Sequence, residues 1–145
     1  MAGGTYCLVM RLDKDTDISI GRRPPVRFPA GFYCYVGSAM NSLEKRIGRH
    51  KSREKRLHWH IDWFLEHARI VEVKSIESNR RMECGLSRDI AGISDGIPMR
   101  GFGSSDCRDC KAHMYYFRGN PSVRLEGVVR KWRSSSGNTA REKGR

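Results

Sequence analysis

The sequence predicts an α+β fold in which helices flank a small antiparallel sheet of about three strands. Strand-like patterns come first along the chain, and helical patterns mixed with shorter strands follow them. With 145 residues, the chain has the size of a single domain that can bury a core. We divide it into a main domain over 1–117 and a basic C-terminal segment over 118–145, which is expected to hold a helix and a flexible tail.

Alternating side chains indicate the strands. Segment 5–12 alternates two sets of side chains with period two, which predicts a half-buried strand: Tyr6, Leu8, Met10 and Leu12 on one face, and Cys7, Val9 and Arg11 on the other. Segment 32–38 is the second strong strand pattern, and Gly31 and Gly37 mark its two ends. Weaker strand patterns occur at 18–20, 26–28, 69–76 and 113–117.

Capping residues and apolar side chains at helical spacing indicate the helices. Either Asn41 or Ser42 is expected to cap a helix with a basic face. Ser78 is expected to cap a later helix over 79–91, in which apolar residues repeat every four positions. Further helical patterns cover 58–68 and 122–132.

The net charge is the most informative property of the composition. Lys and Arg number 28 against 16 Asp and Glu, which gives a formal net charge of +12. Segment 118–145 holds eight basic and two acidic residues, and segment 45–56 holds seven basic residues opposed only by Glu54. An excess of this size favours a polyanionic partner, and nucleic acid is the commonest one.

Membrane and secreted classes are not indicated. The sequence has no run of 18 apolar residues and no basic-then-apolar pattern at its start, so we expect a cytoplasmic protein without a membrane partner. Its five cysteines are an odd number and are scattered, which does not fit a secreted disulfide framework.

One candidate site lies after the second strand, where Arg46 and His50 are one helical turn apart. A guanidinium is a planar fork of donors that suits phosphate oxygens. A nearby imidazole can move a proton at neutral pH. The pair therefore predicts a phosphate-handling site, and a solvated basic helix face is the alternative reading of the same residues.

Two further groups could bind metals. Glu83 shares a helix face with Leu86 and Ile90, so its carboxylate lies either at the edge of the core or against a cation. Cys107, Cys110 and His113 form a CxxCxxH group, to which the fold could add Cys84 as a fourth ligand. Zn²⁺ takes four ligands at such spacings, usually from two separated pairs, so structural zinc stands beside the alternative of plain buried cysteines.

Two tripeptides extend the analysis: Gly-Thr-Tyr at 4–6 and Tyr-Val-Gly at 35–37. They resemble the name-giving motifs of the GIY-YIG endonuclease superfamily, and the likeness is closest to its small stand-alone, Uri-type prokaryotic members. The order of Arg46, His50 and Glu83 after the second tripeptide is similar to that family's helix arginine, following histidine or tyrosine, and later glutamate. The likeness covers roughly 3–117, with an insertion between the two motif strands, because 28 residues separate the two tyrosines.

The resemblance implies a GIY-YIG-like fold and a metal-dependent endonuclease that hydrolyses phosphodiester bonds in nucleic acid, with DNA favoured over RNA. It implies that Glu83 holds one Mg²⁺ or Mn²⁺ ion. The implied catalytic residues are Tyr6, Tyr35, Arg46, His50 and His58. The implied nucleic-acid contacts are Gly37, Lys45, Arg49, Lys51, Lys55 and Arg56.

Several alternatives stay open. Either Tyr6 or His50 could be the general base, since the phenol needs a lowered pKa and the imidazole does not. A non-catalytic nucleic-acid-binding protein that keeps the nuclease fold is the main rival function, and a zinc-stabilised interaction module is another. The sequence leaves open DNA against RNA, the structure of the substrate and the oligomeric state.

Overall fold

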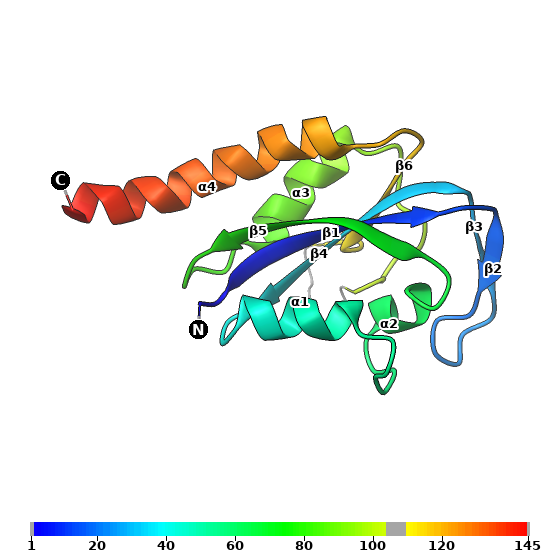
Figure 1. The fold of residues 1–145 in the computed structure, drawn as a ribbon. Helices are drawn as coiled ribbons and strands as arrows, with labels where there is room; N and C mark the ends of the chain where they lie inside the picture. The colour runs from blue at the N-terminus through cyan, green and yellow to red at the C-terminus, as the bar shows by residue number, and fades with distance from the viewer. Residues whose placement is uncertain (1, 104–109, 145) are drawn as a thin grey trace.

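A four-stranded antiparallel sheet forms the middle layer of the protein, and helices cover both of its faces (Figure 1). The computed structural model describes residues 2–103 and 110–144, with side chains as far as residue 134. In spatial order the strands are β5 (Arg69–Glu77), β1 (Gly4–Leu12), β4 (Gly31–Ala39) and β6 (Met114–Phe117). The predicted α+β class is confirmed. The prediction of about three strands is wrong, since β6 adds a fourth.

The central strand β1 has two buried faces. Tyr6 and Leu8 belong to the apolar cluster on one side of the sheet, whereas Cys7 and Val9 belong to the cluster on the other side. All four are at most 1% exposed. The alternation in the sequence therefore assigned the faces correctly, but the expectation of a half-buried strand is wrong because helices cover both faces.

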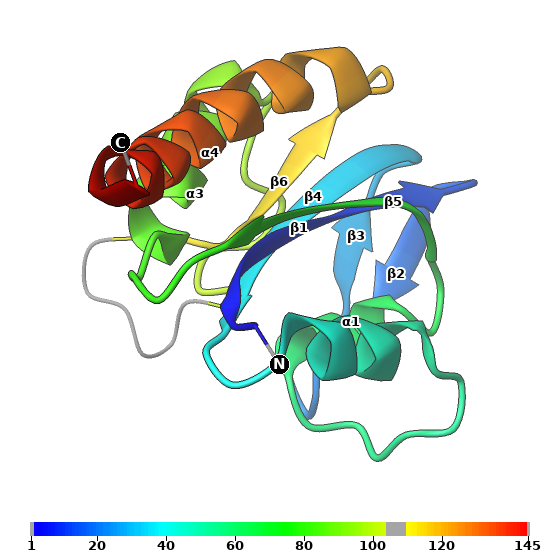
Figure 2. The ribbon, with the colours of Figure 1, turned by 60° about the vertical axis from the view of Figure 1, so that its left-hand side comes forward.

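The first face carries α1 (Leu43–Lys51), α2 (His60–Phe64) and a hairpin of β2 (Thr16–Ile18) and β3 (Val26–Phe28), as Figure 2 also shows. Ser42 caps α1 as predicted, because its hydroxyl accepts a hydrogen bond of 3.2 Å from the Lys45 amide. α2 is much shorter than the helix predicted over 58–68, because its backbone is extended at Trp59 and its cap is at Leu65.

The opposite face carries α3 (Glu83–Ile93) and α4 (Ser122–Gly144). α3 begins four residues later than predicted, because the Ser78 hydroxyl accepts from the Arg80 amide and closes only a turn. α4 continues well beyond residue 132, where the sequence predicts the start of a flexible tail. Within the described part, Trp132 packs its ring against Gly85 of α3.

A buried lysine joins α4 to the edge strand of the sheet. Lys74 of β5 is 6% exposed, and its Nζ lies 3.0 Å from a carboxylate oxygen of Glu72 and 3.0 Å from one of Glu126. Burial alone would lower the pKa of Lys74, but these two hydrogen bonds outweigh it and raise the pKa. α4 is thus held on the sheet by charge as well as by apolar contacts, and the domain boundary at residue 117 stays a prediction.

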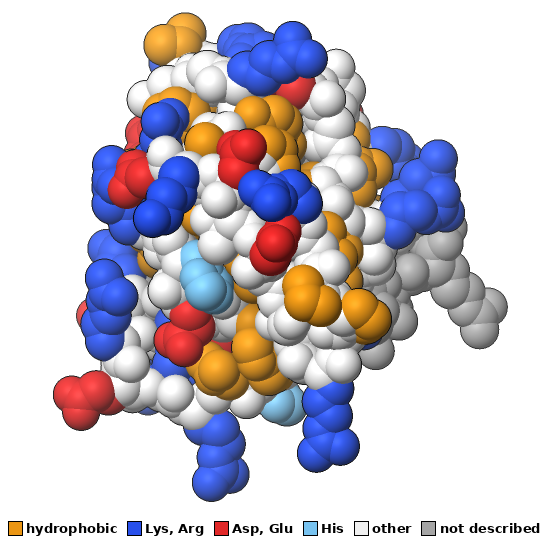
Figure 3. Space-filling model, turned by 90° about the vertical axis from the view of Figure 1, so that its right-hand side faces the viewer, with side chains coloured by type: hydrophobic (Ala, Val, Ile, Leu, Met, Phe, Trp, Pro, Cys, Tyr) orange, Lys and Arg blue, Asp and Glu red, His pale blue; other side chains and the backbone are white. Residues whose placement is uncertain are grey.

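Basic side chains are spread over the surface, with acidic ones among them. Figure 3 shows Lys and Arg side chains over much of one face of the molecule, with Asp and Glu side chains among them. Within the described ranges, no helix is long and apolar enough to cross a membrane. The expected cytoplasmic location stays a prediction.

Candidate functional site

A cavity of about 460 Å³ opens where β1 and β4 meet the helices α1 and α3. Six of the residues that the sequence analysis singled out line it together, although up to 77 positions separate them along the chain. These six are Tyr6, Tyr35, Gly37, Arg46, His58 and Glu83. Ser38, Trp59, His60 and Gly103 complete the wall.

The pairing of β1 with β4 places the Tyr6 ring directly over Gly37. The two residues are partners in the antiparallel register. A Cβ atom at Gly37 would lie 2.5 Å from the Tyr6 hydroxyl and 2.6 Å from Cζ. Only glycine leaves room for the ring at this position, so Gly37 serves first of all to position Tyr6.

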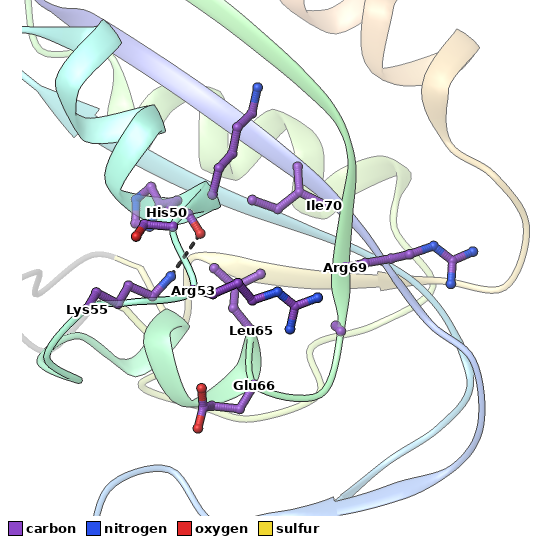
Figure 4. Close-up of a pocket in the computed structure, with 10 residues that line it drawn as sticks. His50, Arg53, Lys55, Leu65, Glu66, Arg69 and Ile70 are labelled. Carbon is purple, nitrogen blue, oxygen red and sulfur yellow. Dashed lines mark hydrogen bonds between the residues drawn. The ribbon is translucent and has the colours of Figure 1, made fainter.

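The Tyr6 hydroxyl lies 2.7 Å from Nε2 of His50, in a buried hydrogen bond. His50 comes from the last turn of α1, is 3% exposed, and stands behind Tyr6 as seen from the large cavity. It lines instead a second cavity of about 240 Å³ (Figure 4), where Lys55 donates a 2.8 Å hydrogen bond to the His50 carbonyl. Tyr6 and His50 thus form a hydrogen-bonded link between two cavities.

Burial keeps both members of this pair neutral. It raises the pKa of Tyr6 to about 12, and the opposing charge of Arg46 offsets only part of the shift. Burial also lowers the pKa of His50 to about 4; the charge of Asp62 opposes this shift, and the positive charges of Lys55, Arg46 and Arg49 add to it. At neutral pH, a neutral phenol therefore faces a neutral imidazole that can accept its proton at Nε2.

Arg46 reaches into the cavity from α1 and is supported on two sides. Its Nη1 donates a 2.9 Å hydrogen bond to the carbonyl of Ser38. Its guanidinium lies 4.5 Å from the centre of the Trp59 ring, which the Arg49 guanidinium also approaches, at 4.2 Å. The remaining N–H groups of Arg46 are therefore held in a fixed orientation beside Tyr6.

Arg49 has a structural contact that the sequence did not reveal. Its two terminal nitrogens each donate a 2.9 Å hydrogen bond to the carboxylate of Asp62, whose side chain is fully buried. Asp62 also accepts from the backbone amides of His58 and Trp59, and so fixes the chain that enters α2. The predicted phosphate contact of Arg49 stays a prediction, as do those of the exposed Lys45, Lys51 and Arg56 and of the half-buried Lys55.

Glu83 is the first residue of α3, and its carboxylate is held at both oxygens. Oε1 accepts a 2.6 Å hydrogen bond from the Ser38 hydroxyl, and Oε2 lies 2.6 Å from Nδ1 of His113. Burial alone would raise the pKa of Glu83, but these contacts outweigh it and lower the pKa. The structure thus presents an ionised carboxylate at the wall of the cavity.

The predicted zinc group is present in part. Ligand atoms of Cys84, Cys110 and His113 all lie within 4.8 Å of one another, so the fold brings Cys84 to the group as the sequence analysis allowed. Cys107 lies outside the described residues, and its part in this group stays a prediction.

Sequence reasoning missed Ser38, Trp59, His60 and Asp62. His60 accepts a 2.9 Å hydrogen bond at Nδ1 from the Gly103 amide, which joins two residues of the cavity wall. For Asp62 a signal existed, since a carboxylate three residues after the start of a helix is a capping pattern. Ser38 carries no signal, because its partner Glu83 is 45 positions away.

Comparison with known proteins identifies the family. No curated protein and no solved structure matches the chain significantly. A family model, described as "Domain of unknown function DUF123", matches residues 5–133. No GIY-YIG family model matches, so the assignment to that superfamily from the two tripeptides is wrong. Three-residue motifs and single spaced residues recur too easily for a superfamily assignment. The chain belongs to the DUF123 family.

Proposed function

We propose that the protein is a metal-dependent endonuclease that hydrolyses phosphodiester bonds in nucleic acid, with DNA as the first substrate to test. One observation carries the proposal: a phenol, a guanidinium and a carboxylate from three separate elements meet in one cavity. They belong to Tyr6 of β1, Arg46 of α1 and Glu83 of α3. Phosphodiester hydrolysis needs a proton acceptor for water, a cation beside the phosphorus, and a stabilised leaving oxygen.

A basic groove beside the cavity supports a polyanionic substrate. Lys45, Arg46 and Arg49 line an adjoining cavity of about 290 Å³ at the start of α1. Arg46 belongs to the walls of both cavities. With the net charge of +12, a nucleic-acid backbone in the groove would place one phosphate at Arg46.

The Glu83 carboxylate fits a divalent cation. Mg²⁺ is commonly held by one or two carboxylates together with waters and substrate phosphate, and each Glu83 oxygen keeps a lone pair beyond its present hydrogen bond. The open cavity leaves room for those waters. When bound, Mg²⁺ or Mn²⁺ would offset negative charge on the leaving oxygen.

Arg46 would bind the scissile phosphate. Its contacts with Ser38 and Trp59 fix the plane of the guanidinium before a substrate arrives. A fork of N–H donors held in this way matches two phosphate oxygens and costs little entropy on binding. The negative charge that develops on phosphorus would then be stabilised next to Tyr6.

Tyr6 and His50 would move the proton as a pair. As water attacks phosphorus, its proton would pass to the Tyr6 oxygen while the Tyr6 proton passes to Nε2 of His50. His50 has no direct access to the large cavity, so it would act through Tyr6. Burial is the main cause of the low His50 pKa, and nearby cations add to it; a bound phosphate beside Arg46 would offset these cations and so would favour the protonated imidazole.

A second candidate is the non-catalytic nucleic-acid-binding protein. The lowered pKa of His50 favours it, because a weakly basic imidazole is a poor final acceptor for the proton of water, and the raised pKa of Tyr6 keeps the phenol protonated at neutral pH. Such a protein would use Arg46 and the neighbouring basic groove without cutting.

The deciding experiment is cleavage of labelled single-stranded, duplex, flapped and branched DNA and RNA with Mg²⁺, Mn²⁺ or chelator. We expect metal-dependent cutting that falls at least ~100-fold in Tyr6→Phe, Arg46→Ala and Glu83→Gln. The matched controls Arg22→Ala and Glu54→Gln change exposed residues and should cut normally. Salt-sensitive binding without cutting under any metal would instead support the binding protein, and cutting that survives all three variants would refute the assigned site.

A further inference from the structure

We propose that Cys84, Cys110 and His113 bind one structural zinc ion at the start of α3. Their ligand atoms lie within 4.8 Å of one another although they come from three points of the chain. In a tetrahedral site with Zn–S bonds of about 2.3 Å, two sulfurs are about 3.8 Å apart. The three side chains therefore need shifts of only about 1 Å to close on an ion.

The chemistry of the three ligands selects zinc. Two thiolates and an imidazole suit Zn²⁺, whereas Mg²⁺ and Mn²⁺ prefer oxygen ligands. The described residues supply three of the four ligands that structural zinc usually takes. The other described cysteines, Cys7 and Cys34, are fully buried in the apolar cluster between the sheet and α3 and are not part of this group.

The contact with Glu83 gives His113 an orientation that suits zinc binding. Zinc-bound histidines usually donate their second ring nitrogen to a carboxylate or carbonyl, which fixes the tautomer and the ring plane. Nδ1 of His113 lies 2.6 Å from Oε2 of Glu83, and we assign the binding of the ion to Nε2. The arrangement is thus one that zinc sites commonly show: a carboxylate contacts the histidine, and the histidine stands beside two thiols.

An ion bound at this group would stabilise the local fold. Between the end of α3 at Ile93 and the start of β6 at Met114, the described residues form no helix and no named strand. The cap residue Met82 also makes no side-chain hydrogen bond to the first turn of α3. The ion would join that first turn to the residues just before β6.

The zinc ion would also position a residue of the cavity. By fixing His113, it would fix Glu83, which lines the cavity on the far side of the same hydrogen bond. The zinc site itself does not depend on the proposed nuclease function. Metal content and cleavage are separate measurements, so the two proposals can fail independently.

The test is the zinc content of the full chain, measured by plasma mass spectrometry after purification without added metal or chelator. We expect about one zinc per chain in the wild type and in the control Cys7→Ala, and a loss of at least ~10-fold in Cys84→Ala and Cys110→Ala. Circular dichroism of each variant would check folding. Because a ligand variant could simply unfold, the wild type is also stripped of metal and titrated with Co²⁺, where a thiolate-to-cobalt absorption band is expected.

Three results would overturn the proposal. One is a folded wild type that holds no zinc and shows no thiolate-to-cobalt band. The other is a Cys84–Cys110 disulfide in the native protein, found by peptide mapping, together with the absence of metal. Equal zinc in the wild type and both folded cysteine variants would likewise place the ion elsewhere and refute this site.

Discussion

Replacing Gly37 by alanine tests the central contact of the cavity. The added Cβ would lie 2.5 Å from the Tyr6 hydroxyl, whereas ordinary contacts begin near 3.4 Å, so the ring would have to retreat by about 0.9 Å. Tyr6 is 1% exposed and its hydroxyl is hydrogen-bonded to His50, so the ring cannot retreat without disturbing that bond. We expect the free energy of unfolding to fall by about 1–3 kcal/mol, the usual cost of overpacking a buried site.

The loss is measured by urea unfolding followed by circular dichroism, and it corresponds to a fall in melting temperature of roughly 3–10 °C for a chain of this size. The same displacement would stretch the 2.7 Å hydrogen bond between Tyr6 and His50. If the proposed proton transfer is correct, cleavage should fall by about 100-fold, since a misplacement near 1 Å has that effect.

Gly48→Ala is the matched control, because Gly48 lies in α1 with nothing within 4 Å of its Cβ position. The identical substitution should there raise the free energy of unfolding by about 0.5–1 kcal/mol through helix propensity. We therefore expect Gly37→Ala to lower the free energy of unfolding and Gly48→Ala to raise it. If Gly37→Ala were as stable as the wild type, the packing of Tyr6 over Gly37 would be refuted.

Three further predictions concern stability, and each is measured by urea unfolding. The pKa of His50 is about 4 in the folded protein against 6.5 ordinarily, so the unfolded chain takes up a proton first as the pH falls. Stability should drop by about 3 kcal/mol between pH 6.5 and 4, and the drop should be smaller in His50→Gln. Arg49→Met should cost about 3 kcal/mol because it leaves the buried Asp62 carboxylate without its cation, and adding Asp62→Asn should recover part of this. Glu126→Gln should cost about 1 kcal/mol, since the buried Lys74 then keeps only Glu72, whereas an unchanged stability would show that Glu126 does not hold α4.

Much of the sheet could be predicted because strand patterns are local. The alternation over 5–12 assigned Tyr6 and Cys7 to opposite faces, and the structure confirms that assignment. The burial of both faces depends on helices that arrive from later in the chain, so a pattern within one strand cannot show it. The late start of α3 has a similar cause, since Ser78 is as good a cap for a turn as for a helix.

The candidate site was predictable where single residues carry distinctive chemistry. Arg46 and Glu83 were selected by their chemistry and Tyr6 through the resemblance of its tripeptide, and the fold brings all three into one cavity. The sequence could not show that Arg49 is held by Asp62, because this pair depends on how the segment before α2 folds back. Nor could the sequence show that Tyr6 lines the large cavity whereas His50 does not, because this difference arises only from packing.

The position of Trp59 has a practical consequence for ligand measurements. Its indole lies in the cavity wall, under the guanidinium of Arg46 and close to that of Arg49. Indole emission responds to nearby charge, so an anion that draws Arg46 away should change the fluorescence without any attached label. The other tryptophans, Trp63 and Trp132, do not line this cavity and can be replaced by phenylalanine to isolate the signal. The protein thus carries its own spectroscopic reporter at the point where a substrate would enter.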